Sequence, residues 1–418
     1  LSDFGALSLL KGQSSEAISS YTSALKDLKL SNDRRVFLLN DRAVAFAREG
    51  QIKSALEDFN AAAQLYPEYA PLYNNRGTLL ISLENYKEAM KDFNRALLLS
   101  PNYVAAYNNR ASLYFKLGQK GEAYDDFSKA LQLAPQSHEV LNSRGRMYLE
   151  LKRPLSALRD FSHAISLDDR FSEAYRNRGI GKLMLQFYSS AVEDYTRALV
   201  FKAEDAELYF LRGEAYLSIG EPSMALKDFN RAIALDPKFE LAYIGRGQTQ
   251  NTLDKSEEAQ SDLNTALEIN PRSAKALAVR ALLEIKKGEI DLAKKDIAQA
   301  LEVEDKVAEV FWAKAVLDEY LNQKAEALAS LAQALELKPW LKDAIDLQLR
   351  LAGGKGDEGP ESTEVPAIDG FQLIRRNGQY FAHNDLYPRL VLPLELVEED
   401  SPKIISWEIK PAPFEGFG

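Results

Sequence analysis

The sequence predicts an all-α fold, a solenoid of antiparallel helix pairs, with a small β segment at its C-terminal end. Three observations support this prediction. A pattern of small, large and proline positions recurs every 34 residues from residue 36 to residue 341. Inside each period, apolar residues recur three and four apart in two runs, which is typical of two amphipathic helices. After residue 369 the pattern changes to short β-prone runs.

The period is defined by small residues at fixed positions. With Gly77 counted as position 8 of its unit, positions 20 and 27 are alanine in all nine full units, and position 24 is always phenylalanine, tyrosine, leucine or isoleucine. Small residues let two helices approach closely, and the larger residue fills the space beside them. Proline at position 32 closes many units, because it lacks a backbone donor and ends a helix. One helical hairpin cannot bury its apolar face alone, so the units are expected to stack.

This pattern closely resembles the tetratricopeptide repeat superfamily. The resemblance covers nine full units from 36 to 341 and a partial first unit, in which Gly5, Ala17, Tyr21 and Ala24 occupy positions 8, 20, 24 and 27. It implies a right-handed superhelix whose first helices line a concave groove that binds proteins or extended peptides. Leu1 falls at position 4, so we expect the chain to begin inside a repeat.

Three segments follow from the pattern. Residues 1–352 form the solenoid, including a capping helix at 342–352; residues 353–368 form a glycine-rich linker; residues 369–418 form a small β-rich module. Asn377-Gly378 between two β-prone runs indicates a hairpin. So short a module either folds alone or completes itself against the solenoid, on the concave face of residues 206–341 or on the end cap.

Eight units carry arginine at position 7, and the same eight carry aspartate at position 23. Antiparallel helices bring these positions to similar heights, so we expect charge-assisted pairs within each hairpin. The alternative is a ladder of ligand-binding arginines. The structural ion pairs singled out are Arg76–Asp92, Arg110–Asp126 and Arg144–Asp160.

Positions 5 and 6 are rich in asparagine in the first half of the chain. The resemblance implies that such side chains hold a peptide backbone, since one amide both donates and accepts. The alternative is helix-surface asparagine without a ligand. The predicted peptide-binding residues are Asn40, Asn74, Asn75, Asn108, Asn109, Asn142, Arg176 and Asn177. In the second half the groove is predicted to be apolar, at Phe210, Leu211, Leu241, Ile244 and Leu282.

Composition excludes several functional classes. A net charge of −10 argues against a nucleic-acid surface, and no apolar stretch is long enough for membrane insertion. The absence of cysteine excludes disulfides and thiolate sites, and slightly favours the periplasm over the cytoplasm. The oligomeric state is not predicted.

Neither a cofactor nor a metal site is expected, because the three histidines are scattered and no phosphate-binding loop occurs. No nucleophile–base pair is evident, so we predict no enzyme activity. The predicted function is a scaffold or adaptor that binds protein or peptide partners on its concave face. The alternative is the recognition or regulatory arm of a larger enzyme whose catalytic domain lies outside this chain.

Overall fold

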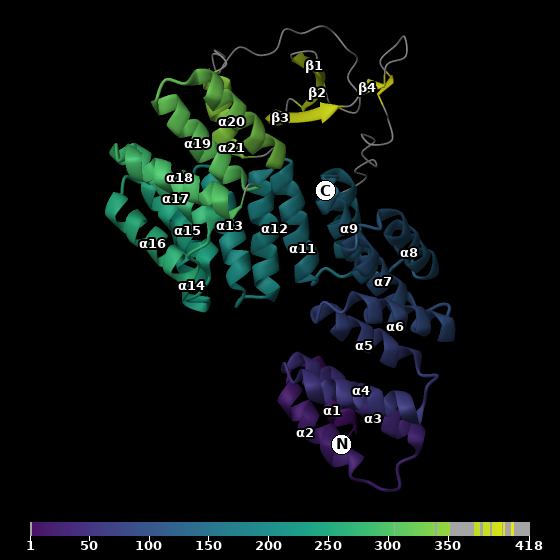
Figure 1. Cartoon of the computed structure of the whole chain (residues 1–418). Helices are drawn as coiled ribbons and strands as arrows, with labels where there is room; N and C mark the ends of the chain where they lie inside the picture. The colour runs from purple at the N-terminus through teal and green to yellow at the C-terminus, as the bar shows by residue number, and fades with distance from the viewer. Residues whose placement is uncertain are drawn as a thin grey trace. The chain divides into compact units, whose positions relative to one another are not determined.

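The computed structural model describes residues 2–304, 306–338 and 341–351, together with the backbone of five short strands between residues 372 and 404. The described residues form 21 α-helices, most of them in antiparallel pairs (Figure 1). They divide into two compact units, Leu1–Met147 and Tyr148–Gly418, here called unit 1 and unit 2. The all-α solenoid of helix pairs predicted from the sequence is confirmed.

Unit 1 begins with the helix pair of the partial repeat and continues with three full repeats. Its helices are α1 Ser2–Leu10, α2 Ser14–Leu25, α3 Asn32–Arg48, α4 Ile52–Leu65, α5 Ala70–Ser82, α6 Tyr86–Leu99, α7 Val104–Lys116 and α8 Lys120–Leu133. The next helix, α9 His138–Glu150, spans the division between the units.

Unit 2 continues the same alternation of first and second helices. Its helices are α10 Pro154–Leu167, α11 Ser172–Met184, α12 Tyr188–Phe201, α13 Ala206–Ser218, α14 Pro222–Leu235, α15 Glu240–Thr252, α16 Ser256–Ile269, α17 Ala274–Lys287, α18 Ile290–Val303, α19 Ala308–Tyr320, α20 Lys324–Leu337 and α21 Lys342–Leu351.

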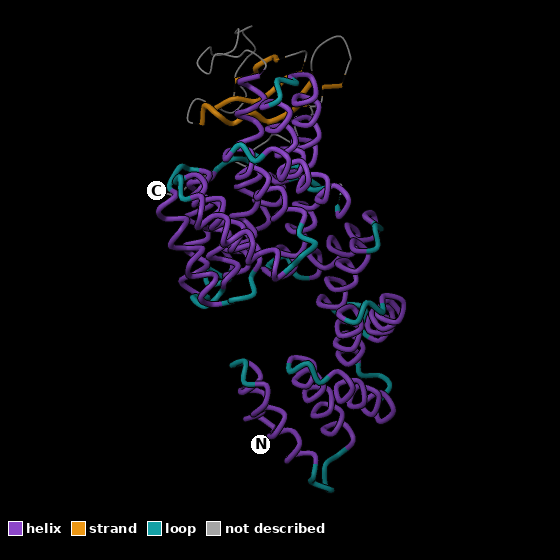
Figure 2. The backbone as a smooth tube through the Cα atoms, turned by 60° about the vertical axis from the view of Figure 1, so that its left-hand side comes forward, coloured by secondary structure: helices purple, strands orange, loops and turns teal. Residues whose placement is uncertain are grey.

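Within each unit the helices stack in chain order. Each first helix packs on its own second helix, and the second helix then packs on the next first helix, as α4 does on α5 and α12 on α13. First helices also contact one another along the stack, for example α3 with α5, α5 with α7 and α13 with α15. Short loops join the helices (Figure 2). The first helices that these contacts join therefore form a layer within each unit.

Every described turn between the two helices of a repeat contains one residue in the left-handed region. It falls at position 15, where Gly118 has φ of 79° and Glu84 has φ of 58°. A residue with positive φ ends the first helix, and glycine adopts this conformation without steric cost. The same turn is therefore made with glycine in some repeats and with a bulkier residue in others.

The core of each hairpin lies between positions 8 and 24. A Cβ added to Gly77 would lie 2.8 Å from Cε1 of Phe93, so the ring occupies the space that a larger residue would need. Phe93 is fully buried, as are Ala89 and Ala96 on either side of it. Close approach of the two helices thus depends on the small residues at positions 8, 20 and 27.

Five short strands follow the helices: β1 Gln372–Arg376, β2 Gln379–Asn384, β3 Tyr387–Leu394, β4 Leu396–Val397 and β5 Lys403–Ile404. β1, β2 and β3 pair antiparallel in that order, with Arg376 opposite Gln379, and β4 pairs with β5. Residues 377–378 and the linker 353–368 lie outside the described residues. That residues 369–418 form a packed module, and that it docks on the solenoid, stays a prediction. None of the described helices combines the length and apolarity needed to span a bilayer.

Candidate functional site

The position-7 arginines hold each hairpin together. In the repeat of α7 and α8, Arg110 Nε donates to Asp126 Oδ2 at 2.7 Å and Nη2 donates to Oδ1 at 2.8 Å. Asp126 is buried, so the bidentate pair compensates a desolvated carboxylate. The same two hydrogen bonds form in Arg42–Asp58, Arg76–Asp92, Arg178–Asp194, Arg212–Asp228, Arg246–Asp262 and Arg280–Asp296. Arg144 and Asp160 belong to different units, and their pairing stays a prediction.

The arginines also join neighbouring repeats, which the sequence analysis missed. The remaining nitrogen, Nη1 of Arg110, donates to Oδ1 of Asn94 in the preceding repeat at 2.7 Å. Asn94 is at position 25, and the equivalent acceptors are Thr22, Asn60, Ser162, Thr196, Asn230 and Asn264. A polar residue at position 25 of so many units was the available signal. With three helices bound by one guanidinium, these arginines are framework and not a ligand surface.

The asparagines at positions 5 and 6 form a hydrogen-bonded ladder between repeats in unit 1. Asn75 Nδ2 donates to Oδ1 of Asn40 at 3.1 Å, and Asn109 Nδ2 donates to Oδ1 of Asn74 at 2.9 Å. Asn74 Nδ2 in turn lies 3.3 Å from Oδ1 of Asn75. We call this set, Asn40, Asn74, Asn75, Asn108 and Asn109, the amide ladder. Asn40 and Asn74 are buried, so the ladder is partly internal and is not plain helix surface.

The ladder has an unsatisfied end. Asn108 Oδ1 is buried and accepts no hydrogen bond from any described residue. The next repeat has Ser143 at position 6, where the two preceding repeats have Asn75 and Asn109. A serine side chain is shorter than an amide, so the pattern of donation that satisfies Asn40 and Asn74 ends at Asn108.

The other predicted peptide-binding residues lie further along the chain. Asn142 is buried in α9, and Asn177 and Arg176 lie on α11 in unit 2. Arg176 Nη2 donates to Glu207 Oε1, whereas its Nε is buried without a described acceptor. The predicted set is thus divided between the two units.

The predicted apolar groove in unit 2 is corrected for two of its five residues. Phe210 and Ile244 are 5% and 0% exposed. Phe210 is buried because the rings of Phe229 and Phe239 cover it, at centroid distances of 5.9 and 5.4 Å. Ile244 packs in the core cluster around Leu263. The remaining three, Leu211, Leu241 and Leu282, are half-buried against neighbouring clusters.

Ion pairs cross between repeats on the same layer of unit 2. Lys275 Nζ lies 3.2 Å from Glu214 Oε1 and 3.9 Å from Glu309 Oε1, and 5.7 Å from the ring centroid of Phe210. Lys338 also pairs with Glu309, at 3.1 Å. Further along, Lys342 of α21 donates to the carbonyl oxygen of Ser218 at the end of α13, at 3.0 Å. The first-helix layer of unit 2 around α13, α17 and α19 is therefore occupied by its own charged side chains.

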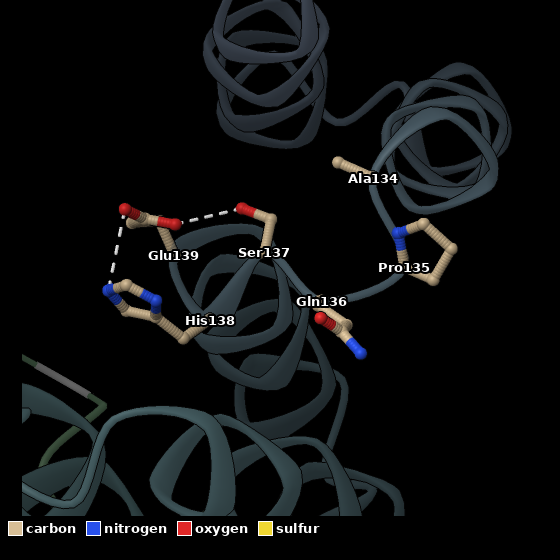
Figure 3. Close-up of a pocket in the computed structure, with 6 residues that line it drawn as sticks. All are labelled: Ala134, Pro135, Gln136, Ser137, His138 and Glu139. Atoms are coloured by element: carbon tan, nitrogen blue, oxygen red, sulfur yellow. Dashed lines mark hydrogen bonds and ion pairs between the residues drawn. The ribbon is translucent and has the colours of Figure 1, made fainter.

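A shallow surface hollow lies along residues 134–139, between α8 and α9 (Figure 3). Ser137 Oγ donates to Glu139 Oε2 at 2.8 Å, and Nε2 of His138 lies 3.4 Å from the other oxygen of Glu139. All six lining residues are consecutive, so the hollow follows one turn of chain. Within the part of the chain that the structure describes, no group of three or more His, Asp or Glu residues is arranged to hold a metal ion.

The fold and these contacts define a class of protein: a helical-hairpin repeat protein whose side-chain networks are built in register along the stack. A family model described as tetratricopeptide repeat matches residues 70–103, 104–137 and 206–239, and a second model with the same description matches residues 241–273. The chain therefore contains tetratricopeptide repeats, at residues 70–137, 206–239 and 241–273.

Several solved structures are similar to this chain. A chain of the APC/C hetero-tetramer Cut9–Hcn1 is 17% identical with a TM-score of 0.51, covering 83% of this chain and 74% of that one. A tetratricopeptide repeat protein from Parabacteroides merdae is 24% identical with a TM-score of 0.44, covering 57% and 94%. Yeast Tom70 is 18% identical with a TM-score of 0.41, covering 84% and 87%. A comparison with curated protein sequences gives no match.

Proposed function

We propose that the chain is a non-enzymatic scaffold whose first-helix layer in unit 1 binds an extended segment of a protein partner at the amide ladder. The observation that carries the proposal is the unsatisfied end of the ladder. Asn108 Oδ1 is buried and accepts no hydrogen bond from the described residues, and the neighbouring Asn109 uses its Nδ2 to reach Asn74. A peptide backbone in extended conformation presents alternating donors and acceptors, which an amide pairs with irrespective of the peptide's side chains.

The proposal places the binding site in unit 1 and leaves unit 2 as framework. Lys275, Glu214 and Glu309 already satisfy one another in unit 2, so an incoming peptide would have to break ion pairs there. In unit 1, by contrast, Asn108 Oδ1 has no hydrogen-bond donor among the described residues, so binding there need not break an ion pair. The presence of tetratricopeptide repeats agrees with a role in protein interaction.

Peptides selected from a random library against the full chain provide the test. We expect the selected peptides to lose at least tenfold in affinity for the variant Asn108→Ala/Asn109→Ala. The matched control is Gln132→Ala on α8, an exposed amide outside the ladder, which should bind as the unchanged chain does. Circular dichroism checks that both variants fold. Unchanged affinity of the double variant would place the site elsewhere and refute the proposal.

A further inference from the structure

One carboxylate beside the amide ladder has no cationic partner. Asp41 lies on α3 at position 6, the register position of Asn75 and Asn109. Its only side-chain hydrogen bond with a described residue comes from Asn40 Nδ2, at 3.0 Å from Oδ1. Among the described residues, no lysine or arginine nitrogen lies within ion-pair distance of Asp41. The neighbouring Arg42 is already bound to Asp58 by two hydrogen bonds.

The environment of Asp41 disfavours an uncompensated charge. Burial raises the pKa of Asp41 above its usual value, and the hydrogen bond from Asn40 offsets this only in part. An isolated carboxylate removed from water costs free energy unless an opposite charge or further donors stabilise it. The recurrent aspartates at position 23, such as Asp58 and Asp92, have an arginine for this purpose. Asp41, at position 6, has no such partner among the described residues.

Aromatic side chains stand around this carboxylate. The Phe37 ring, one helical turn before Asp41, is 46% exposed and meets the ring of Tyr69 edge to face, with centroids 4.9 Å apart. Tyr69 lies near enough to Asp41 and Tyr103 that their charges, added to burial, raise the pKa of its hydroxyl to about 12. The charge of Asp41 also acts on Tyr21: burial, and then this charge, raise the pKa of the Tyr21 hydroxyl to about 12.

A free carboxylate beside an exposed aromatic ring is complementary to one kind of group. A lysine ammonium or an arginine guanidinium pairs with the carboxylate and is also attracted to the face of an aromatic ring. The net charge of −10 would draw a basic segment toward the chain. Asn40 occupies Oδ1 of Asp41, so Oδ2 is the oxygen left for a cation.

We propose that Asp41, Phe37 and Tyr69 form the docking site for one lysine or arginine side chain of the extended partner segment. The proposal rests on the proposed function, because the cation would be carried by the same peptide that lies on the amide ladder. It adds a statement of specificity: the ladder accepts any backbone, whereas Asp41 selects a basic residue at one place in the peptide.

The probe is the tightest-binding peptide from the library selection, tested against the full chain. Its basic residue is replaced by a neutral counterpart, acetyl-lysine for lysine or citrulline for arginine. We expect each neutral peptide to bind at least tenfold more weakly to the unchanged chain. The original peptide should bind the variant Asp41→Asn at least tenfold more weakly than it binds the unchanged chain. On that variant, replacing the basic residue by its neutral counterpart should lower the affinity by less than a further twofold.

Thermal unfolding of Asp41→Asn shows whether a loss of binding comes from a loss of folding. Because burial of the charge is unfavourable, Asp41→Asn should keep or raise the midpoint of thermal unfolding while binding falls. A purely structural Asp41 would instead lower that midpoint. Phe37→Ala should lower the affinity for the basic peptide several-fold more than the affinity for the neutral peptide. The matched controls are Asp125→Asn and Tyr124→Ala on α8, an exposed aspartate and a ring that is 50% exposed, which should leave binding unchanged.

Three other outcomes have distinct meanings. If the ladder variant Asn108→Ala/Asn109→Ala loses binding but the selected peptides carry no basic residue that couples to Asp41, the docking site is refuted and the proposed function stands. If the peptides couple to Asp41 but ignore the ladder, the cation site stands and the backbone-binding role is refuted. Self-association that is lost in Asp41→Asn, with no peptide binding, would identify a second copy of the chain as the occupant and refute the peptide site.

Discussion

Arg110 and Asp126 are joined by two parallel hydrogen bonds, at 2.7 and 2.8 Å, and the third nitrogen of the same guanidinium reaches Asn94 of the preceding repeat at 2.7 Å. One side chain thus fixes the two helices of its own hairpin and the second helix of the repeat before it. Because the repeat occurs many times, the contact sets both the geometry of each hairpin and the register of the stack.

Replacing either Arg110 or Asp126 with alanine should lower the free energy of unfolding by about 1–4 kcal/mol, because the partner is left buried and unpaired. The double replacement should cost clearly less than the sum of the two, which urea unfolding of all four proteins measures. Additive costs would contradict the pairing. Asn94→Ala should cost about 1 kcal/mol, the net value of one typical hydrogen bond, because this bond is exposed to solvent.

The turns between helices offer a second measurement. Glu84 and Lys152 adopt φ of 58° and 56° at the position where Gly118 and Gly220 have φ of 79°. Glu84→Gly and Lys152→Gly should each stabilise the chain by roughly 0.5–1 kcal/mol, because a residue with a Cβ is strained in this region. Gly118→Ala should destabilise it by about 1 kcal/mol. Thermal unfolding of the three variants shows whether each change stabilises or destabilises the chain. A loss of stability in both Glu84→Gly and Lys152→Gly would contradict the argument.

The amide ladder predicts unequal effects for neighbouring asparagines. Asn74 is buried, accepts from Asn109 and donates to Asn75, so Asn74→Ala should lower the unfolding free energy by about 1–3 kcal/mol. Asn108 has an unsatisfied oxygen, so Asn108→Ala should change it by less than about 0.5 kcal/mol. Equal costs in thermal unfolding would mean that Asn108 has a partner after all.

The sequence was sufficient to predict the framework because each framework position recurs. Alanine at positions 20 and 27, the ring at position 24 and the arginine–aspartate pairs occupy the same environment in successive repeats, so chance variation in one unit does not obscure the pattern. Position 25 carried the same kind of signal, at residues such as Asn60 and Asn94, but its partner lies in the adjacent repeat.

Features that depend on the rotation between repeats could not be predicted in the same way. The type of residue at Asn74 does not reveal that Asn109 of the next repeat reaches it. Likewise an apolar residue at position 5, such as Phe210, is predicted equally well as groove surface or as core. The ring of Phe239, just before the next first helix, decides this by covering it.

Glu284 supplies the last prediction. It lies on α17, is 5% exposed, and its Oε2 accepts no hydrogen bond from the described residues. Arg280 is 3.9 Å from the other oxygen but is itself bound to Asp296. Burial first, and then the negative charge of Asp296, raise the pKa of Glu284 from 4.5 to about 7.

The sign of the pH dependence follows from this raised pKa. The folded chain binds the proton more tightly than the unfolded chain, so the stabilisation is complete below about pH 4.5 and is lost as pH rises to about 7. Glu284→Gln keeps the shape without the charge, and should therefore raise the free energy of unfolding by about 2–3 kcal/mol more at pH 8 than at pH 5. Urea unfolding at both pH values measures the difference. The exposed Glu268→Gln on α16 is the control and should show no such difference. An equal effect of Glu284→Gln at both pH values would show that this carboxyl group has the same proton affinity in the folded and unfolded chain.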